Sequence, residues 1–200
     1  SGLSVTTGVQ NTLIGGLAGD AITTGGDNIA LGYLALSSDT TGQRSVAIGR
    51  AALFAQNLSG GTLSYNTAIG YNAGTAVTTG TKNTIIGGLA GDAITTGANN
   101  VGLGYSSLSA NTTGIQNTAV GVNSLLANTT GASNTAIGTG ALSANTTAHY
   151  NTAVGQSALA ANTTGTQNVA LGAYALDANT TGHYNTATGY NSLNGNSTGN

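Results

Sequence analysis

Residues 134–150 read Asn-Thr-Ala-Ile-Gly-Thr-Gly-Ala-Leu-Ser-Ala-Asn-Thr-Thr-Ala-His-Tyr, and close variants of this stretch fill the chain. Eleven such units begin at Asn11, Asn28, Ser45, Asn66, Asn83, Asn100, Asn117, Asn134, Asn151, Asn168 and Asn185. Successive starts lie 17 residues apart, except that 21 residues separate Ser45 from Asn66. A fixed period of this kind indicates a repeat architecture, in which every unit occupies the same environment.

The repeat is too short for a pair of helices, which needs about twice its length. Counted from the first residue of each unit, position 5 is always Gly, and position 4 is Ile, Leu or Val except at Thr188. The motif Thr-Ala-Val-Gly suits a short strand, and the Asn, Thr and Gly residues at positions 12 to 15 suit a turn. We therefore predict an all-β fold: a parallel β-solenoid or β-roll of eleven coils. Each coil should contain two short strands and two turns, and coils should stack about 4.8 Å apart.

The interior can be inferred from covariation inside the chain. Most units carry Leu at position 9 and a polar residue at position 12, as in Leu142 and Asn145. Three units carry Gly at position 9 and an aliphatic residue at position 12: Gly19 with Ile22, Gly74 with Val77, and Gly91 with Ile94. This pattern predicts one interior slot per coil that is filled from either position. The aliphatic residue at position 4 is expected to supply the rest of the core.

Such a core is thin, and small residues form a second stripe. Positions 3 and 8 are Ala, Ser or Gly in every unit, apart from Leu13 and Ile85. We interpret this stripe as an interface between parallel chains, most simply in a homotrimer, so that the chain's partner is itself. The alternative is that the small residues fill a narrow single-chain coil. Residues 1–200 are expected to be one repeat domain, a fragment of a longer fibre, with a loop insertion at 57–65.

Composition argues against several classes of partner. The chain has three Lys and Arg residues against five Asp residues, a net charge of −2, and only 4% charged residues. It lacks the basic surface that neutralises phosphates and the Lys/Arg cluster that holds an anionic bilayer. No apolar run approaches the roughly 18 residues of a membrane span. We expect neither nucleic acid nor membrane to contact this segment.

The stretch Ser45-Val-Ala-Ile-Gly49, with the Asn-Thr-Ala-Ile/Val-Gly units, resembles the head repeats of trimeric autotransporter adhesins. That resemblance implies a left-handed parallel β-roll in a homotrimer. The repeat is longer than the family's usual unit because of its Asn-Thr-Thr-Gly segment, which leaves handedness open. The longer unit is also similar to the repeats upstream of self-cleaving chaperone domains in phage tail fibres. Both resemblances imply an extracellular fibre, on a cell surface or a virion, that is used in attachment.

Residues for catalysis are scarce. The chain has no Cys and no Glu, and its five Asp residues are scattered. His149 and His183 fall two coils apart, about 9.6 Å along the stack, which is too far to share a metal ion within one chain. We therefore expect no enzymatic activity, no cofactor and no metal.

Two sets of residues remain as candidate sites. Exposed tyrosines could stack on sugar rings, and the candidates for glycan contact are Tyr65, Tyr71, Tyr184 and Tyr190. Five Asn-Thr-Thr motifs match the N-glycosylation pattern, at Asn111, Asn128, Asn145, Asn162 and Asn179. The alternative for these Asn residues is a stacked ladder that ties turns together.

Three functions compete on this evidence. The first is the shaft of a phage tail fibre or bacterial filament. The regular period favours this hypothesis, because a binding site would interrupt the period and only residues 57–65 do so. The second is an adhesin that binds glycan through its tyrosine-bearing loops. The Thr array also suggests an ice-binding solenoid, as a minor alternative, because neighbouring Thr side chains on a strand point to opposite faces.

Overall fold

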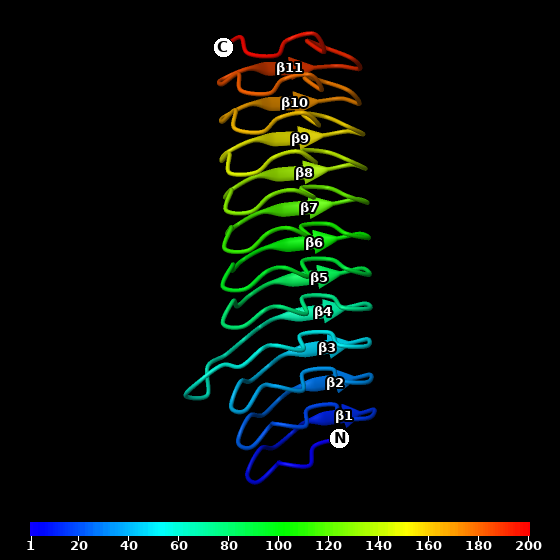
Figure 1. The fold of residues 1–200 in the computed structure, drawn as a ribbon, viewed down its shortest axis with the longest axis vertical. Helices are drawn as coiled ribbons and strands as arrows, with labels where there is room; N and C mark the ends of the chain where they lie inside the picture. The colour runs from blue at the N-terminus through cyan, green and yellow to red at the C-terminus, as the bar shows by residue number, and fades with distance from the viewer.

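The computed structural model describes residues 1–200 as one continuous stack of coils without a helix (Figure 1). Eleven parallel strands of three residues form a single sheet in chain order, which confirms the predicted β-solenoid. The strands are β1 (Thr12–Ile14), β2 (Ile29–Leu31), β3 (Val46–Ile48), β4 (Thr67–Ile69), β5 (Thr84–Ile86), β6 (Val101–Leu103), β7 (Thr118–Val120), β8 (Thr135–Ile137), β9 (Thr152–Val154), β10 (Val169–Leu171) and β11 (Thr186–Thr188). Each strand occupies positions 2 to 4 of its repeat. Below, coils 1 to 11 take the numbers of their strands.

The register between coils equals the repeat length. Thr118 pairs with Thr135 and Thr135 with Thr152, so identical positions lie side by side. The ion pair between Asp27 and Arg44, with 3.6 Å between Oδ2 and Nε, places the last residues of two successive coils next to each other. The 17-residue coil is thereby confirmed.

The second strand expected in each coil does not form. Outside positions 2 to 4 the coil consists of turns and bends, although backbone hydrogen bonds still join neighbouring coils, as between Leu142 N–H and the Ala158 carbonyl (3.0 Å). The reason lies in the backbone. Residues at positions 7, 9 and 17 have left-handed dihedrals, with φ of 51° at Leu142 and 61° at Tyr150. A strand requires φ near −120°, so these residues interrupt any extended run.

The invariant Gly at position 5 is required by both dihedral angle and space. Gly121 has a φ of 130°, a region that residues with a side chain rarely adopt. A Cβ atom placed there would lie 2.7 Å from the carbonyl carbon of Gly138 in the next coil. The same close approach recurs along the stack, so these glycines allow the coils to stack directly.

The small residues of positions 3 and 8 line the inside of the single-chain coil. Ala136 and Ala141 are completely buried, and nearly every equivalent Ala in the other coils is too. Our interpretation of this stripe as a chain–chain interface is therefore wrong, and the narrow-coil alternative is right. The coil closes so tightly that these positions hold small side chains, except where Gly at position 9 leaves room, as for the buried Ile85.

The aliphatic residues of position 4 lie on the outer face of the sheet, which contradicts their predicted place in the core. Those that rank as exposed retain between 37% (Ile86) and 57% (Ile14) of their accessible surface. The reason is strand geometry: successive side chains point to opposite faces. An inward Ala at position 3 thus turns positions 2 and 4 outward.

The interior slot behaves as predicted and has a third contributor. A Cβ atom on Gly91 would lie 2.8 Å from Cδ1 of Ile94, so a side chain at position 9 and an aliphatic side chain at position 12 compete for one space. The same Cβ would lie 3.3 Å from Ile85, one of the two large residues at position 3. Leu13 plays the same part beside Gly19. Large residues at position 3 thus stand in two of the three coils with Gly at position 9, where they help to fill its space; in coil 4, Ile85 of the next coil does so beside Gly74.

Candidate functional site

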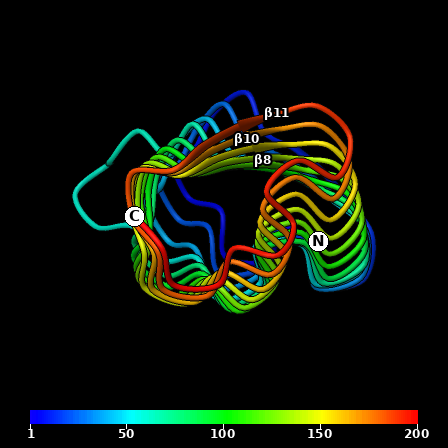
Figure 2. The same cartoon turned by 90° about the horizontal axis from the view of Figure 1, so that it is seen from above.

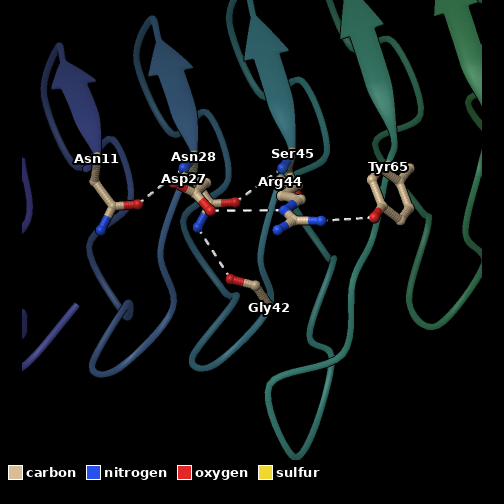
Figure 3. A network of polar contacts seen from close by, with 7 residues as sticks. All are labelled: Asn11, Asp27, Asn28, Gly42, Arg44, Ser45 and Tyr65. Atoms are coloured by element: carbon tan, nitrogen blue, oxygen red, sulfur yellow. Dashed lines mark hydrogen bonds and ion pairs between the residues drawn. The ribbon is translucent and has the colours of Figure 1, made fainter. Parts of the chain in front are cut away.

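A ladder of Asn side chains runs inside the stack at position 1. The backbone N–H of Asn134 donates to Oδ1 of Asn117 (3.1 Å), and its Nδ2 donates to the Ala148 carbonyl (2.8 Å). The first bond joins two coils, and the second closes one coil on itself, from position 1 to position 15. Figure 3 shows the start of this ladder, where Asn28 reaches the Gly42 carbonyl and accepts from Ser45 N–H. The Asn that begins a repeat therefore has a structural role: it links two successive coils and closes its own coil.

A second ladder occupies position 12, at the five Asn-Thr-Thr motifs. Nδ2 of Asn145 donates to Oδ1 of Asn128 (2.8 Å), and Nδ2 of Asn162 donates to Oδ1 of Asn145 (3.1 Å). All five side chains are completely buried: Asn111, Asn128, Asn145, Asn162 and Asn179. The glycosylation hypothesis is wrong for the folded coil, because the nitrogen that would carry a glycan is enclosed and already donates hydrogen bonds. The ladder alternative is correct.

Coil 3 has no Asn at position 1 or position 12, and a different network of polar side chains takes the place of the two ladders there. Ser45 stands where an Asn is missing, and Gln56 fills position 12. Nε2 of Gln56 donates to Asp39 Oδ2 (2.6 Å) and Ser45 Oγ (2.7 Å), and its Oε1 accepts from Asn66 Nδ2 (2.8 Å). The loop that follows projects from the stack between β3 and β4 (Figures 1 and 2). Sequence reasoning missed this network, although Ser45, Asp39 and Gln56 all break the pattern near the insertion.

The four candidate tyrosines are exposed but do not converge. Tyr65 and Tyr184 precede strands β4 and β11, whereas Tyr71 and Tyr190 follow these strands. Their exposed fractions are 46%, 53%, 70% and 76% for Tyr65, Tyr71, Tyr184 and Tyr190. The surface has no pocket. Any recognition by these side chains is therefore by an open surface.

Only Tyr65 and Tyr71 carry a charged neighbour. Nη1 of Arg44 donates to the Tyr65 hydroxyl (2.7 Å), and the guanidinium carbon lies 5.7 Å from the ring centre (Figure 3). The hydrogen bond and electrostatic interaction with Tyr65 raise the pKa of Arg44 above its ordinary value; desolvation opposes this rise, and Asp27 adds less to it. Arg50 lies 5.4 Å from the Tyr71 ring centre. We call Arg44–Tyr65 the upstream pair and Arg50–Tyr71 the downstream pair, after their places before and after the strands.

The two histidines bind the backbone of the preceding coil. Nδ1 of His149 accepts from Ala132 N–H (2.9 Å), and Nδ1 of His183 accepts from Thr166 N–H (3.0 Å). These bonds place the ring proton on Nε2. The histidines therefore serve as coil-to-coil ties.

The Thr residues of the turn form two columns along the stack, at positions 13 and 14. At position 13, Oγ1 of Thr129 donates to the Thr146 carbonyl (3.1 Å), and the same bond recurs in most coils. The hydroxyl groups of this column are thus engaged with the next coil. The Thr side chains of position 14, such as Thr147 and Thr164, are exposed. A further column of Thr residues, at position 2, lies on the outer face of the sheet and is interrupted by Ile29, Val46, Val101 and Val169.

No protein-family model, curated protein or solved structure matches the chain. The structure contains no apolar helix of a length that crosses a bilayer. It also contains no group of three His, Cys, Asp or Glu side chains that could hold a metal ion.

Proposed function

We propose that this chain is a non-catalytic shaft segment of an extracellular fibre used in attachment, in which three parallel copies pack through the outer face of the sheet. The observation that carries this proposal is the composition of that face. Its two outward positions hold only Thr, Val, Ile and Leu over all eleven strands. An exposed apolar stripe that runs the length of a protein marks an interaction surface.

A second copy of the chain is the occupant that fits this face best. The face is as long as the stack and without charge, so its complement must be equally long and regular. Another copy meets both requirements. Three copies, rather than two, and an extracellular place on a cell or virion are proposed from the resemblance of the repeats to trimeric adhesins and phage fibres.

The mass of the particle in solution tests the association. Light scattering should give three times the chain mass of 19.2 kDa. Ile137→Lys places a charge in the middle of the outer face, where it must lose its hydration on association, and should yield smaller particles. Thr164→Lys, on the exposed column of position 14, is the matched control and should leave the mass unchanged. A folded wild-type monomer at micromolar concentration would contradict the proposal.

A further inference from the structure

All of the positive charge of the chain lies in one segment. Residues 40–91 contain Arg44, Arg50 and Lys82 and no Asp or Glu, whereas the rest of the chain contains five Asp residues and no base. Of the acids before this segment, Asp39 is buried and Asp27 pairs with Arg44 (3.6 Å), which leaves Arg50 and Lys82 without an acidic partner. The same segment holds the one departure from the period, residues 57–65. A cationic patch on an otherwise acidic chain selects a partner of negative charge.

The chemistry of the patch narrows the kind of partner. Each pair places a planar guanidinium over the ring of an exposed tyrosine, and Lys82 follows Tyr65 by 17 residues in the same column. A guanidinium donates two parallel hydrogen bonds to a carboxylate. A tyrosine ring beside it offers an apolar face and a polar hydroxyl. A sugar that carries a carboxylate fits both groups: its anion can pair with the guanidinium, and its apolar ring face can stack on the tyrosine.

Symmetry brings the two pairs together. Within one chain they flank the strands β3 and β4 on opposite sides, with the outer face between them. In a cyclic oligomer the contact is heterologous, so the upstream side of one sheet lies beside the downstream side of the next. Rotation about the fibre axis also keeps equivalent coils at the same height. The upstream pair of one chain and the downstream pair of its neighbour therefore meet at each seam.

We propose that each seam between two chains binds an acidic saccharide through both Arg–Tyr pairs and Lys82. This site rests on the proposed trimer and assigns a ligand to it. Coils 5 to 11, which keep the period without interruption, act as a spacer, and coils 2 to 4 carry the residues of recognition.

Calorimetric titration with matched probes tests the ligand class. A hyaluronan octasaccharide, in which every second sugar carries a carboxylate, should bind the trimer. A chitin octasaccharide, which has no carboxylate, should bind about tenfold more weakly or not at all, because charge-assisted hydrogen bonds are lost. Arg50→Ala should weaken hyaluronan binding to a similar degree. Tyr105→Ala, at the repeat position of Tyr71 but without an Arg neighbour, should leave binding unchanged.

Mixed trimers test the seam. One variant is Arg50→Ala, and the other combines Arg44→Ala with Lys82→Ala, so every seam of either homotrimer lacks one half of the site. Co-expression of the two variants creates one complete seam in each mixed trimer, and binding should return at one site per trimer. A site within a single chain would not recover, because no chain in the mixture has both halves.

The possible outcomes distinguish a failure of the saccharide site from a failure of the proposed trimer. A particle of trimeric mass that binds no hyaluronan, or binds a single-stranded octadeoxynucleotide equally well, overturns the acidic-saccharide site and leaves the fibre proposal standing. Binding without recovery in mixed trimers overturns the shared seam. A monomeric particle overturns the proposed trimer and the seam together.

Discussion

Coils 1, 4 and 5 bury Ile22, Val77 and Ile94 at position 12, whereas coils 6 to 10 bury a ladder of Asn at the same position. The first set packs aliphatic side chains against Gly at position 9, and the second packs Leu from position 9 beside hydrogen-bonded amides. Both interiors are completely buried and both keep the same strand register. The coil path is therefore set by what the two regions share, the Gly at position 5 and the Asn at position 1.

The two interiors differ in how many coils a single substitution affects. An aliphatic slot is bounded by side chains of its own coil and at most of the two adjacent coils, as at Gly74 with Leu53 and Ile85, so it can be altered locally. From Asn128 onward, each Asn of the ladder donates to the coil before it and accepts from the coil after it, as Asn145 does with Asn128 and Asn162. The ladder is therefore expected to behave as a cooperative unit, while the aliphatic coils vary one at a time.

The largest expected effect is a break in the middle of the ladder. Asn145→Ile should lower the free energy of unfolding by about 3–5 kcal/mol, because it removes the partner of buried amide groups and crowds Leu142. Adding Leu142→Gly should relieve the crowding, and a left-handed φ of 51° at this residue suits Gly. The ladder stays broken in the double variant, so its stability should return only in part.

Chemical denaturation of the two single variants and the double variant measures this coupling as a double-mutant cycle. Strictly additive effects would show that positions 9 and 12 do not share a slot. Full recovery in the double variant would show that the Asn ladder contributes nothing to stability.

A change of interior at the boundary between the two regions should be tolerated better. Coil 5 adjoins the ladder at Asn111, whose Nδ2 donates only to the Gly114 carbonyl (3.1 Å). Gly91→Leu alone should cost about 1–3 kcal/mol through overpacking against Ile94 and Ile85.

The triple variant Ile85→Ala, Gly91→Leu, Ile94→Asn should cost less than the sum of its three single changes, by about 0.5–3 kcal/mol. It gives coil 5 the same residues that coils 7 to 10 carry at positions 3, 9 and 12, and it extends the Asn ladder by one residue. Thermal unfolding of the three single variants and the triple variant decides this. A triple variant as unstable as the sum would mean that the two interiors are not interchangeable.

The buried apolar residues form two clusters along the stack, and a substitution at their boundary should stabilise the protein. One cluster ends at Ile94 and the other begins at Leu108, and Gly102 replaces the usual Ala between them. A Cβ atom there would lie 3.5 Å from Leu108 Cδ1, an ordinary contact, and 3.2 Å from Ser107 Oγ, which would have to move by a few tenths of an ångström. Gly102→Ala should raise stability by about 0.4–1 kcal/mol, chiefly by restricting the unfolded chain. A lower melting temperature would show that the Ser107 side chain does not yield.

The smallest expected effect is a pH dependence in coil 5. Burial raises the pKa of Asp92 above its ordinary value, although hydrogen bonds from its own backbone and from Ser109 lower it, and its Oδ1 has no partner. The folded state thus holds this proton more tightly than the unfolded state. Its contribution to stability is present below the unfolded pKa and is lost as pH rises through the folded pKa.

Asp92→Asn removes this dependence, since an amide does not titrate. The melting temperature of the variant minus that of the wild type should therefore become more positive from about pH 3 to about pH 7. A difference that is constant over this range, or that falls, would contradict the assigned direction of the shift.

Sequence alone determined the period, the eleven coils, the strand positions and the shared interior slot, because each is a regularity that repeats along the chain. It also contained signals that sequence reasoning left unused. Leu13 and Ile85 stand in two of the three coils with Gly at position 9, and residues 40–91 contain every Lys and Arg.

Only the tertiary structure decided which side of each strand faces inward. Ala136 and Ile137 are adjacent and both apolar, so composition favoured the larger residue as core, yet the coil encloses Ala136 and exposes Ile137. The same closure buries Asn145, which a glycosylation motif alone would place on the surface. The physical reason is the width of the coil: a narrow interior admits methyl groups and paired amides, and that width is set by contacts between residues far apart in each turn.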